Sequence, residues 1–167
     1  MTVAPDVEET RRPGEAALVY VERMAREKAD AGRALCARQG FPLRPVLGAD
    51  TVVIVDEDVL AKTADRGEAR RQLARLSGRE HLVVTAVCLS GTAVRSAVSR
   101  TRVVFKSLSA AEIARYCATR EPLGKAGSYA IQGRGGMFVT HLSGSYSGVV
   151  GLPLYECAGL LRDEGLL

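Results

Sequence analysis

The chain of 167 residues has no tryptophan, five tyrosines, three phenylalanines, two histidines and four cysteines. So few aromatic rings argue against a platform on which nucleic-acid bases stack. The cysteines lie far apart without the paired spacing of a zinc site, so buried, reduced thiols are expected. The two histidines are isolated and are expected in structural or solvated positions, not in a metal cluster. These six residues are Cys36, Cys88, Cys117, Cys157, His81 and His141.

Long hydrophobic runs are also missing. The longest, residues 46–55, is interrupted by Asp50 and is about half the length that a membrane span needs. The first six residues have neither the basic nor the apolar part of a signal peptide. With 47% hydrophobic and 25% charged residues, the composition is that of a soluble globular chain. The sequence therefore predicts a cytoplasmic protein with one domain spanning residues 1–167 and no membrane segment.

No strong excess of charge is present either. Lysine and arginine number 23 against 19 acidic residues, for a net charge of +4, and no block of five basic residues occurs. A nucleic-acid binder usually shows a basic stripe or a recognisable module, and neither is found here. The mild positive excess suits a small anionic ligand.

The hydrophobic pattern predicts helices alternating with strands. Pro13 opens a helical pattern that Gly40 ends, and further helices are expected from Asp65 to residue 77, from Ser109 to residue 119, and after Pro153. Strands are expected at residues 46–55, 59–61, 81–89, 94–105 and 137–142. Hairpins mixed with crossover helices predict a single α/β domain with a mixed, twisted sheet flanked by helices.

Asp50 is the first candidate for chemistry, because an unpaired carboxylate in a buried strand is unfavourable and needs a cation, a donor or a metal. The alternative is that Asp50 caps a neighbouring backbone. A turn at residues 56–58 would return Lys62 alongside Asp50, although a solvated lysine at a strand end is the other interpretation. Lys28 lies on the apolar side of its helix, from which it could also extend to water.

Glycine is concentrated between residues 124 and 136, together with Lys125 and Arg134. Such a loop frees backbone amides to approach anions, and the two cations add charged donors. The loop lacks the Gly-Lys-Ser/Thr ending of a Walker-type loop, so this signal is weak on its own. Residues 144–153 could present further amides at the start of the last helix.

Taken in order, these motifs resemble the Maf family over nearly the whole chain. The resemblance is carried by Gly48-Ala49-Asp50-Thr51, Leu76-Ser77-Gly78 with His81, Thr85-Ala86-Val87, Lys125-Ala126-Gly127, Ile131-Gln132-Gly133 and Gly144-Ser145-Tyr146-Ser147 through Leu154. It implies an inosine-triphosphatase-like fold and a nucleoside triphosphate pyrophosphatase that uses a divalent cation, Mg²⁺ or Mn²⁺. The motifs at residues 48–51 and 144–147 resemble the branch that prefers dTTP and UTP, in contrast to the branch with Gly-Ser-Asp-Gln that favours methylated GTP.

The resemblance also implies roles for individual residues. Asp50 matches the catalytic carboxylate that accepts a proton from the attacking water, and Glu9 matches an acidic position near the metal, where Asp50 would be a second ligand. Lys28 and Lys62 match phosphate-contacting lysines, and Gln132 matches a glutamine near the nucleotide. Mg²⁺ needs only one or two carboxylates beside the substrate phosphates. The expected partner is a nucleoside triphosphate, with neither nucleic acid nor membrane, and a homodimer is left open.

Three departures from the family pattern stand out. Gly-Lys-Pro is Ala61-Lys62-Thr63 here, which keeps the lysine, and Asp-Lys-Ala-Gly is Gly124-Lys125-Ala126-Gly127, which removes a carboxylate. The third is the start: family members begin with a buried strand and a Ser-x-Ser-Pro-Arg-Arg loop, and residues 1–12 supply neither. The expectation is a chain truncated at its start and much less active than one carrying that loop. The alternative function is a weakened nucleotide-binding or regulatory protein involved in division control.

Overall fold

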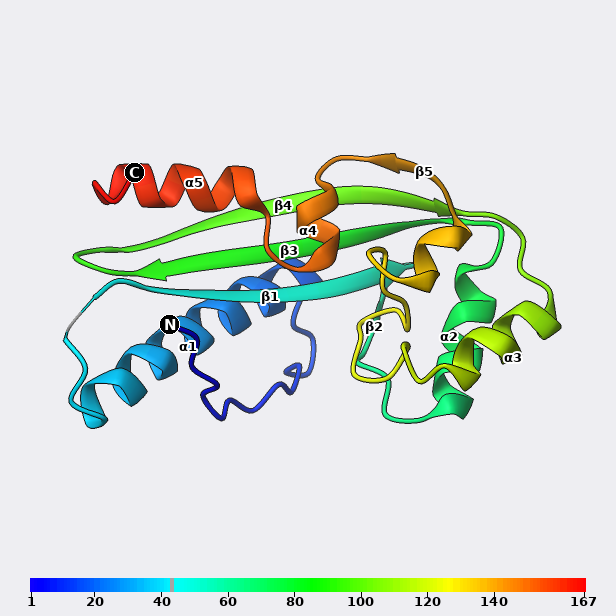
Figure 1. Cartoon of the computed structure of the whole chain (residues 1–167), viewed down its shortest axis with the longest axis horizontal. Helices are drawn as coiled ribbons and strands as arrows, with labels where there is room; N and C mark the ends of the chain where they lie inside the picture. Colours follow the sequence, from blue (N-terminus) through cyan, green and yellow to red (C-terminus); the bar gives the residue numbers. More distant parts are fainter. Residues whose placement is uncertain (43) are drawn as a thin grey trace.

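A five-stranded antiparallel sheet forms the centre of the structure, in the order β2-β1-β3-β4-β5 (Figure 1). The computed structural model describes residues 1–42 and 44–167. The strands are β1 (Val46–Val55), β2 (Asp58–Leu60), β3 (Glu80–Ser90), β4 (Val94–Phe105) and β5 (Val139–Ser143). Strands β1, β3 and β4 are long and pair over most of their length, whereas β2 pairs only with the last three residues of β1. Along residues 46–52, the side of β1 that faces away from β3 therefore has no strand beside it among the described residues.

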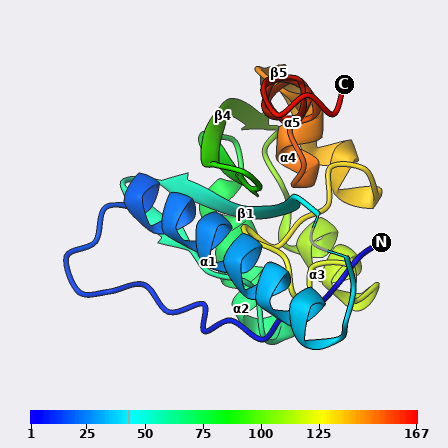
Figure 2. The same ribbon diagram turned by 90° about the vertical axis from the view of Figure 1, so that its left-hand side faces the viewer.

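Helices cover both faces of this sheet. Helix α1 (Ala17–Arg38) packs on one face, and Figure 2 shows α4 and α5 on the other. The remaining elements are α2 (Arg66–Leu76), α3 (Ala110–Ala118), the 3₁₀ helix η1 (Arg134–Phe138), α4 (Tyr146–Val150) and α5 (Leu154–Asp163). Within the described residues, none of the helices combines the length and the apolar character needed to cross a membrane.

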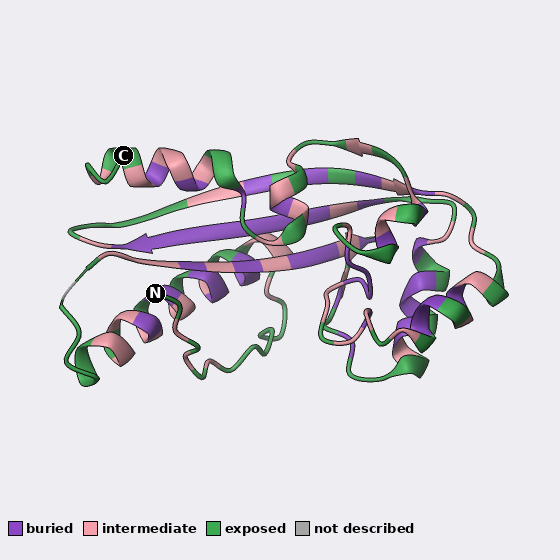
Figure 3. Cartoon of the chain, viewed as in Figure 1, coloured by how far each residue is buried: buried purple, intermediate pink, exposed green. Residues whose placement is uncertain are grey.

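The hydrophobic core follows the two-residue period of the strands. On β3, the even-numbered Val84, Ala86 and Cys88 pack toward α1. The odd-numbered Val87 and Leu89 pack toward α5. Alternate side chains of a strand point to opposite faces, so a strand covered on both faces is buried almost throughout. Figure 3 shows this for β3, whereas buried and half-buried residues are interspersed along β1.

Several expectations from the sequence are confirmed in detail. Strand β1 covers residues 46–55 as predicted, and the predicted turn pairs Val53 with Leu60 and Ile54 with Val59. The Asp65 carboxylate accepts a hydrogen bond from the Glu68 N–H at 2.8 Å at the start of α2. Ser109 and Glu112 form a complete capping box at the start of α3. Local polar signals therefore place the starts of α2 and α3 correctly.

Other boundaries differ from the predictions. Helix α1 begins at Ala17 instead of near Pro13, because Gly14 adopts a left-handed φ of 73° and closes a turn before the helix. Residues 137–142 were expected to form one strand, but the stretch divides into the end of η1 and most of β5. The short helix α4 was not predicted. Its start is capped by Ser145, whose hydroxyl accepts from the Gly148 N–H at 3.0 Å.

The α/β class with a sheet flanked by helices is confirmed, but the expected mixture of parallel and antiparallel neighbours is wrong. All four described strand pairs are antiparallel. The crossover through α2 joins β2 to β3, and these two strands do run in the same direction. However, β1 lies between them and is antiparallel to both, so the crossover creates no parallel neighbours.

Three of the four cysteines are buried as predicted, whereas Cys36 is half-buried, and of the two histidines His81 is buried and His141 is exposed. All four cysteines are free, and Cys88, Cys117 and Cys157 are buried. His81 is buried beside Phe105, and its Nε2 lies 2.9 Å from the Tyr129 hydroxyl. Its Nδ1 has no partner among the described residues. Burial lowers the pKa of His81 to about 4, so the imidazole is neutral near pH 7.

This buried histidine predicts a pH dependence of stability. Because its pKa in the folded state lies below the unfolded value, the unfolded chain takes up the proton first as the pH falls from about 6.5 to about 4. Replacing His81 by leucine should therefore reduce the loss of unfolding free energy between about pH 7 and pH 4.5 by about 2 kcal/mol. Urea denaturation of both proteins at both pH values measures this difference. An identical loss in the variant would show that His81 titrates normally in the fold.

Candidate active site

Asp50 is a buried carboxylate near the middle of β1. Its residue is 6% exposed, and Gly48 precedes it by two positions on the same face of the strand. A Cβ atom on Gly48 would lie 2.5 Å from the backbone nitrogen of Ala29 and closer still to the Ala25 oxygen. The absence of a side chain at this position lets α1 lie directly against β1. That close approach brings the same turn of the helix, residues 25–29, next to Asp50.

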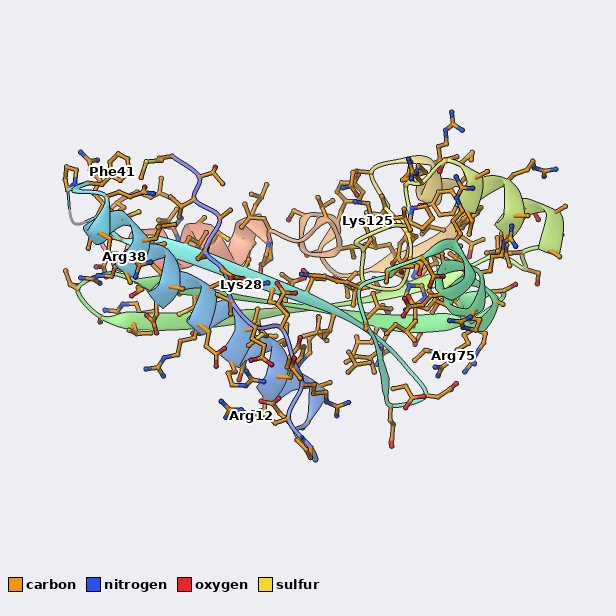
Figure 4. All side chains as sticks on the ribbon, turned by 90° about the horizontal axis from the view of Figure 1, so that it is seen from below. Arg12, Lys28, Arg38, Phe41, Arg75 and Lys125 are labelled. Atoms are coloured by element: carbon orange, nitrogen blue, oxygen red, sulfur yellow. The ribbon has the colours of Figure 1, made fainter. Side chains whose placement is uncertain are left out.

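Lys28 is the residue that α1 brings there. Its Nζ donates a hydrogen bond to Asp50 Oδ1 at 2.6 Å and lies 2.6 Å from Glu9 Oε1. Figure 4 shows Lys28 on α1 near the centre of the molecule, away from the helix ends. The lysine therefore does not extend to water from the apolar side of its helix. It is the partner that a buried aspartate requires.

Glu9 joins this pair to Lys62. Its Oε2 pairs with Lys62 Nζ, while its Oε1 contacts Lys28. The Tyr20 hydroxyl of α1 donates to the Glu9 backbone oxygen at 3.1 Å and holds the segment before the helix in place. The four charged side chains thus form a continuous chain of ion pairs in the order Asp50, Lys28, Glu9, Lys62.

A third lysine comes from the glycine-rich loop after α3. Lys125 lies in this loop, and Figure 4 shows it to the right of Lys28 near the centre of the molecule. Gly127 has a left-handed φ of 68°, and a Cβ there would lie 2.9 Å from a methyl group of Val53. A residue with a side chain would be strained at this φ and would also collide with β1. Glycine therefore allows the loop to close against the strand that carries Asp50.

Helix α4 forms another side of the site and is attached to the sheet by threonine hydroxyl groups of β1 and β3. The Thr51 and Thr85 hydroxyls are 2.8 Å apart, and Thr85 Oγ1 donates to the Gly148 backbone oxygen at 2.7 Å. Thr85 is fully buried in the sheet. These hydrogen bonds connect β1 and β3 to α4, whose Val149 and Val150 face the same space as Asp50.

These elements enclose a cavity of about 290 Å³. Its charged and amide-bearing lining residues are Lys28, Asp50, Lys62, Lys125 and Gln132. A second cavity of about 340 Å³ adjoins it, sharing Asp50, Thr51 and Lys62 and adding Glu9 and Arg11. Three ammonium groups around one buried carboxylate define a site for an anion with several charges.

Burial and pairing shift the pKa values of these groups in different directions. Burial raises the pKa of Asp50, and the hydrogen bond from Lys28 only partly offsets this effect. For Lys28 and Glu9, burial opposes the charged forms, but their hydrogen bonds outweigh it, so the pKa of Lys28 is raised and that of Glu9 is lowered. The pKa of Asp50 shifts against its charged form, unlike those of Lys28 and Glu9, because Asp50 is the most buried of the three side chains. A carboxylate with a raised pKa is a stronger base than a solvated one.

The structure brings together the residues selected from the sequence. Asp50, Lys28, Lys62 and Gln132 line one cavity, and Glu9 lines the adjoining one. Lys125 was recognised as a cation in the glycine-rich loop but was given no specific role. The contribution of α4 and of the Thr51–Thr85 contact was missed, because a hydroxyl inside a strand gives no distinctive sequence signal.

The same residues can be tested as a metal site. Among the described residues, no group of three or more acidic, histidine or cysteine side chains converges on one point. The Glu9 and Asp50 carboxylates nevertheless both lie 2.6 Å from one cation, the Lys28 ammonium. Two neighbouring carboxylates meet the need of a hard divalent cation for one or two carboxylate ligands, with water and phosphate as the others.

The structure is an α/β domain with a cavity lined by three lysines and a buried aspartate, and comparisons with known proteins show its family. The family model described as "Maf-like protein" matches residues 1–164. A dTTP/UTP pyrophosphatase of Bordetella parapertussis is 55% identical over 163 residues, covering 97% of this chain and 79% of that protein. Proteins with the same name from Chromobacterium violaceum and Shewanella oneidensis are each 50% identical, covering 96% and 99% of this chain and 81% and 84% of their own lengths. The chain belongs to the Maf family.

The pairing of Lys28 with Asp50 can be measured by a double-mutant cycle. Replacing Lys28 by methionine leaves a buried carboxylate without its cation and should reduce the free energy of unfolding by about 3 kcal/mol at neutral pH. Replacing Asp50 by asparagine in the same protein removes the unpaired charge and should restore most of this loss. Urea denaturation of the two single variants and the double variant gives the coupling. Simple additivity of the two effects would contradict the pairing.

Proposed function

We propose that this chain hydrolyses dTTP and UTP to the nucleoside monophosphate and pyrophosphate. The observation that carries the proposal is the cavity in which three lysines surround the buried Asp50 carboxylate. The names of the Bordetella, Chromobacterium and Shewanella relatives support the substrate class. Gln132 lines the same cavity and offers both a donor and an acceptor to a nucleotide.

Asp50 acts as the general base in this proposal. Lys28 holds Oδ1, which leaves Oδ2 to accept a proton from a water molecule as that water attacks phosphorus. The bond between the α-phosphate and the bridging oxygen then breaks, and pyrophosphate leaves with the bonding electrons. Burial raises the pKa of Asp50 and thereby increases its basicity, which favours the proton transfer.

The lysines bind and orient the phosphates. Lys28 reaches the cavity from α1, Lys62 follows β2, and Lys125 lies in the glycine-rich loop, so they approach a polyphosphate from three directions. Ammonium groups placed around the chain of phosphates stabilise the phosphate charge to a similar degree in the bound substrate and in the transition state. Glu9 holds Lys28 and Lys62 in the free protein, and phosphate oxygens would compete with it for Lys62.

A divalent cation, Mg²⁺ or Mn²⁺, fits the proposal. Glu9 and Asp50 would hold it together with phosphate oxygens of the substrate. Such a cation supplies neutralisation of phosphate charge and polarisation of a phosphoryl oxygen.

The direct test is pyrophosphate release from a panel of nucleotides. Incubation with dTTP, UTP, dATP, dCTP and GTP in the presence of Mg²⁺ or Mn²⁺ should release pyrophosphate fastest from dTTP and UTP. Removal of the metal by a chelator should abolish release, and addition of either metal should restore it, because the lysines alone leave phosphate charge unbalanced. Binding of nucleotides without any pyrophosphate release would contradict the proposal and favour a nucleotide-binding protein.

The role of Asp50 can be tested separately. Asp50→Asn should lower kcat for dTTP by about 10²-fold or more, because the amide cannot accept the proton from water. The matched control is Asp163→Asn, since Asp163 is exposed at the end of α5. The control should retain the kcat of the parent protein. Robust activity of Asp50→Asn would rule out Asp50 as the base.

A further inference from the structure

The two loops that carry Lys62 and Lys125 are bonded to each other. Lys62 and Ala126 form an isolated antiparallel bridge, and the Gly124 N–H donates to the Thr63 oxygen at 2.8 Å. The Thr63 N–H and its hydroxyl both donate to the Lys125 backbone oxygen, at 3.3 Å and 3.2 Å. Thr63, which follows Lys62, thus binds the backbone of Lys125. The backbone segments that carry the two lysines are therefore linked and cannot move independently.

A buried polar cluster lies behind this junction. It consists of Gln72 from α2, Thr63 and Ser128, which are 6%, 2% and 0% exposed. The Ser128 hydroxyl donates to Gln72 Oε1 at 2.7 Å, the Thr63 and Ser128 hydroxyls are in contact, and Thr63 Oγ1 lies 3.4 Å from Gln72 Oε1. Gln72 Nε2 donates to the Ala61 backbone oxygen at 3.0 Å. Gln72 therefore binds residues on both sides of Lys62 and a residue of the Lys125 loop.

The position of Gln72 is unusual for a glutamine. The other buried residues of α2 are Ala69, Leu73 and Leu76, so Gln72 is the one polar member of the helix face that packs on the core. Burying an amide without partners is unfavourable, whereas the same amide with satisfied hydrogen bonds fixes its neighbours in one arrangement. An apolar side chain could fill this space, but it could not hold the Ala61 oxygen and the Ser128 hydroxyl.

We propose that Gln72, Thr63 and Ser128 form a clamp that positions Lys62 and Lys125 for the phosphates of the substrate. The inference rests on the function proposed above and assigns positioning residues to it. None of the three side chains supplies a charge to the cavity. They act through the two lysine-bearing loops, which they join to α2.

The clamp has a specific kinetic consequence. Asp50 lies on β1 and is held by Lys28 of α1, and the clamp contacts neither residue directly. Loosening the clamp should therefore weaken the binding of phosphates and leave proton transfer largely unchanged. A loss of binding shared by the bound substrate and the transition state raises KM without lowering kcat.

The test combines Thr63→Val and Gln72→Met, each of which keeps the size of the side chain and removes its polar groups. Each variant should raise KM for dTTP about tenfold, equivalent to about 1.4 kcal/mol, and change kcat by less than about threefold. Titration calorimetry with inorganic pyrophosphate should show a similar loss of affinity, which does not depend on turnover. Thr63→Ser keeps the hydroxyl and should behave like the parent protein.

Ser77→Ala is the matched control for a merely structural effect. Ser77 ends the same helix, and its hydroxyl accepts from the Leu108 N–H at 2.7 Å instead of contacting either lysine loop. This variant should lower the thermal midpoint but leave KM and pyrophosphate affinity unchanged. If Thr63→Val and Gln72→Met behave like Ser77→Ala, or lower kcat at unchanged KM, the clamp is refuted. A parent protein that releases no pyrophosphate would instead refute the proposed function.

Discussion

The arrangement of the site depends on one requirement, which is that the buried carboxylate of Asp50 must have a cation beside it. Lys28 meets this requirement from α1, and it can do so only because Gly48 lets the helix lie directly on β1. A methyl group at Gly48 would collide with the backbone of α1 near Ala29 and move Lys28 away from Asp50. A packing constraint in the core therefore sets the geometry of the charged groups. The same pair places Lys28 where it also holds Glu9, so the orientation of the segment before α1 follows from it.

Much of the fold could be predicted because its signals are local. The β-branched run of β1, the turn that pairs Val53 with Leu60, and the caps at Asp65 and Ser109 each depend on neighbouring residues. Sheet direction could not be predicted in the same way. Whether a crossover joins neighbouring parallel strands depends on what lies between them, and here β1 occupies the position between β2 and β3. Only the complete sheet contains that information.

The candidate site, like the fold, could be predicted from the sequence only in part. A lone aspartate in an apolar strand indicates that a partner must exist, and the predicted hairpin brings Lys62 toward it. The identity of the first partner, Lys28, was not evident, because a lysine on an apolar helix face is equally compatible with contact to water. Thr63 is a further example. It departs from the family pattern by what looks in the sequence like a mild substitution, yet its hydroxyl is buried against Gln72 and Ser128. Contacts between residues nine and sixty-five positions apart leave no periodic signal.

The charges of the site explain why a metal belongs in the proposed reaction. Lys28, Lys62, Lys125 and Arg11 contribute four positive charges, and Asp50 and Glu9 contribute two negative ones, which leaves a balance of +2. A nucleoside triphosphate carries about four negative charges near neutral pH. Bringing it next to the Asp50 carboxylate without further compensation would be opposed by repulsion in a partly buried site, where charge interactions are strong. A divalent cation held by Glu9 and Asp50 would add two positive charges and would offset this repulsion. The acidic residues that otherwise repel the substrate would then contribute to its binding.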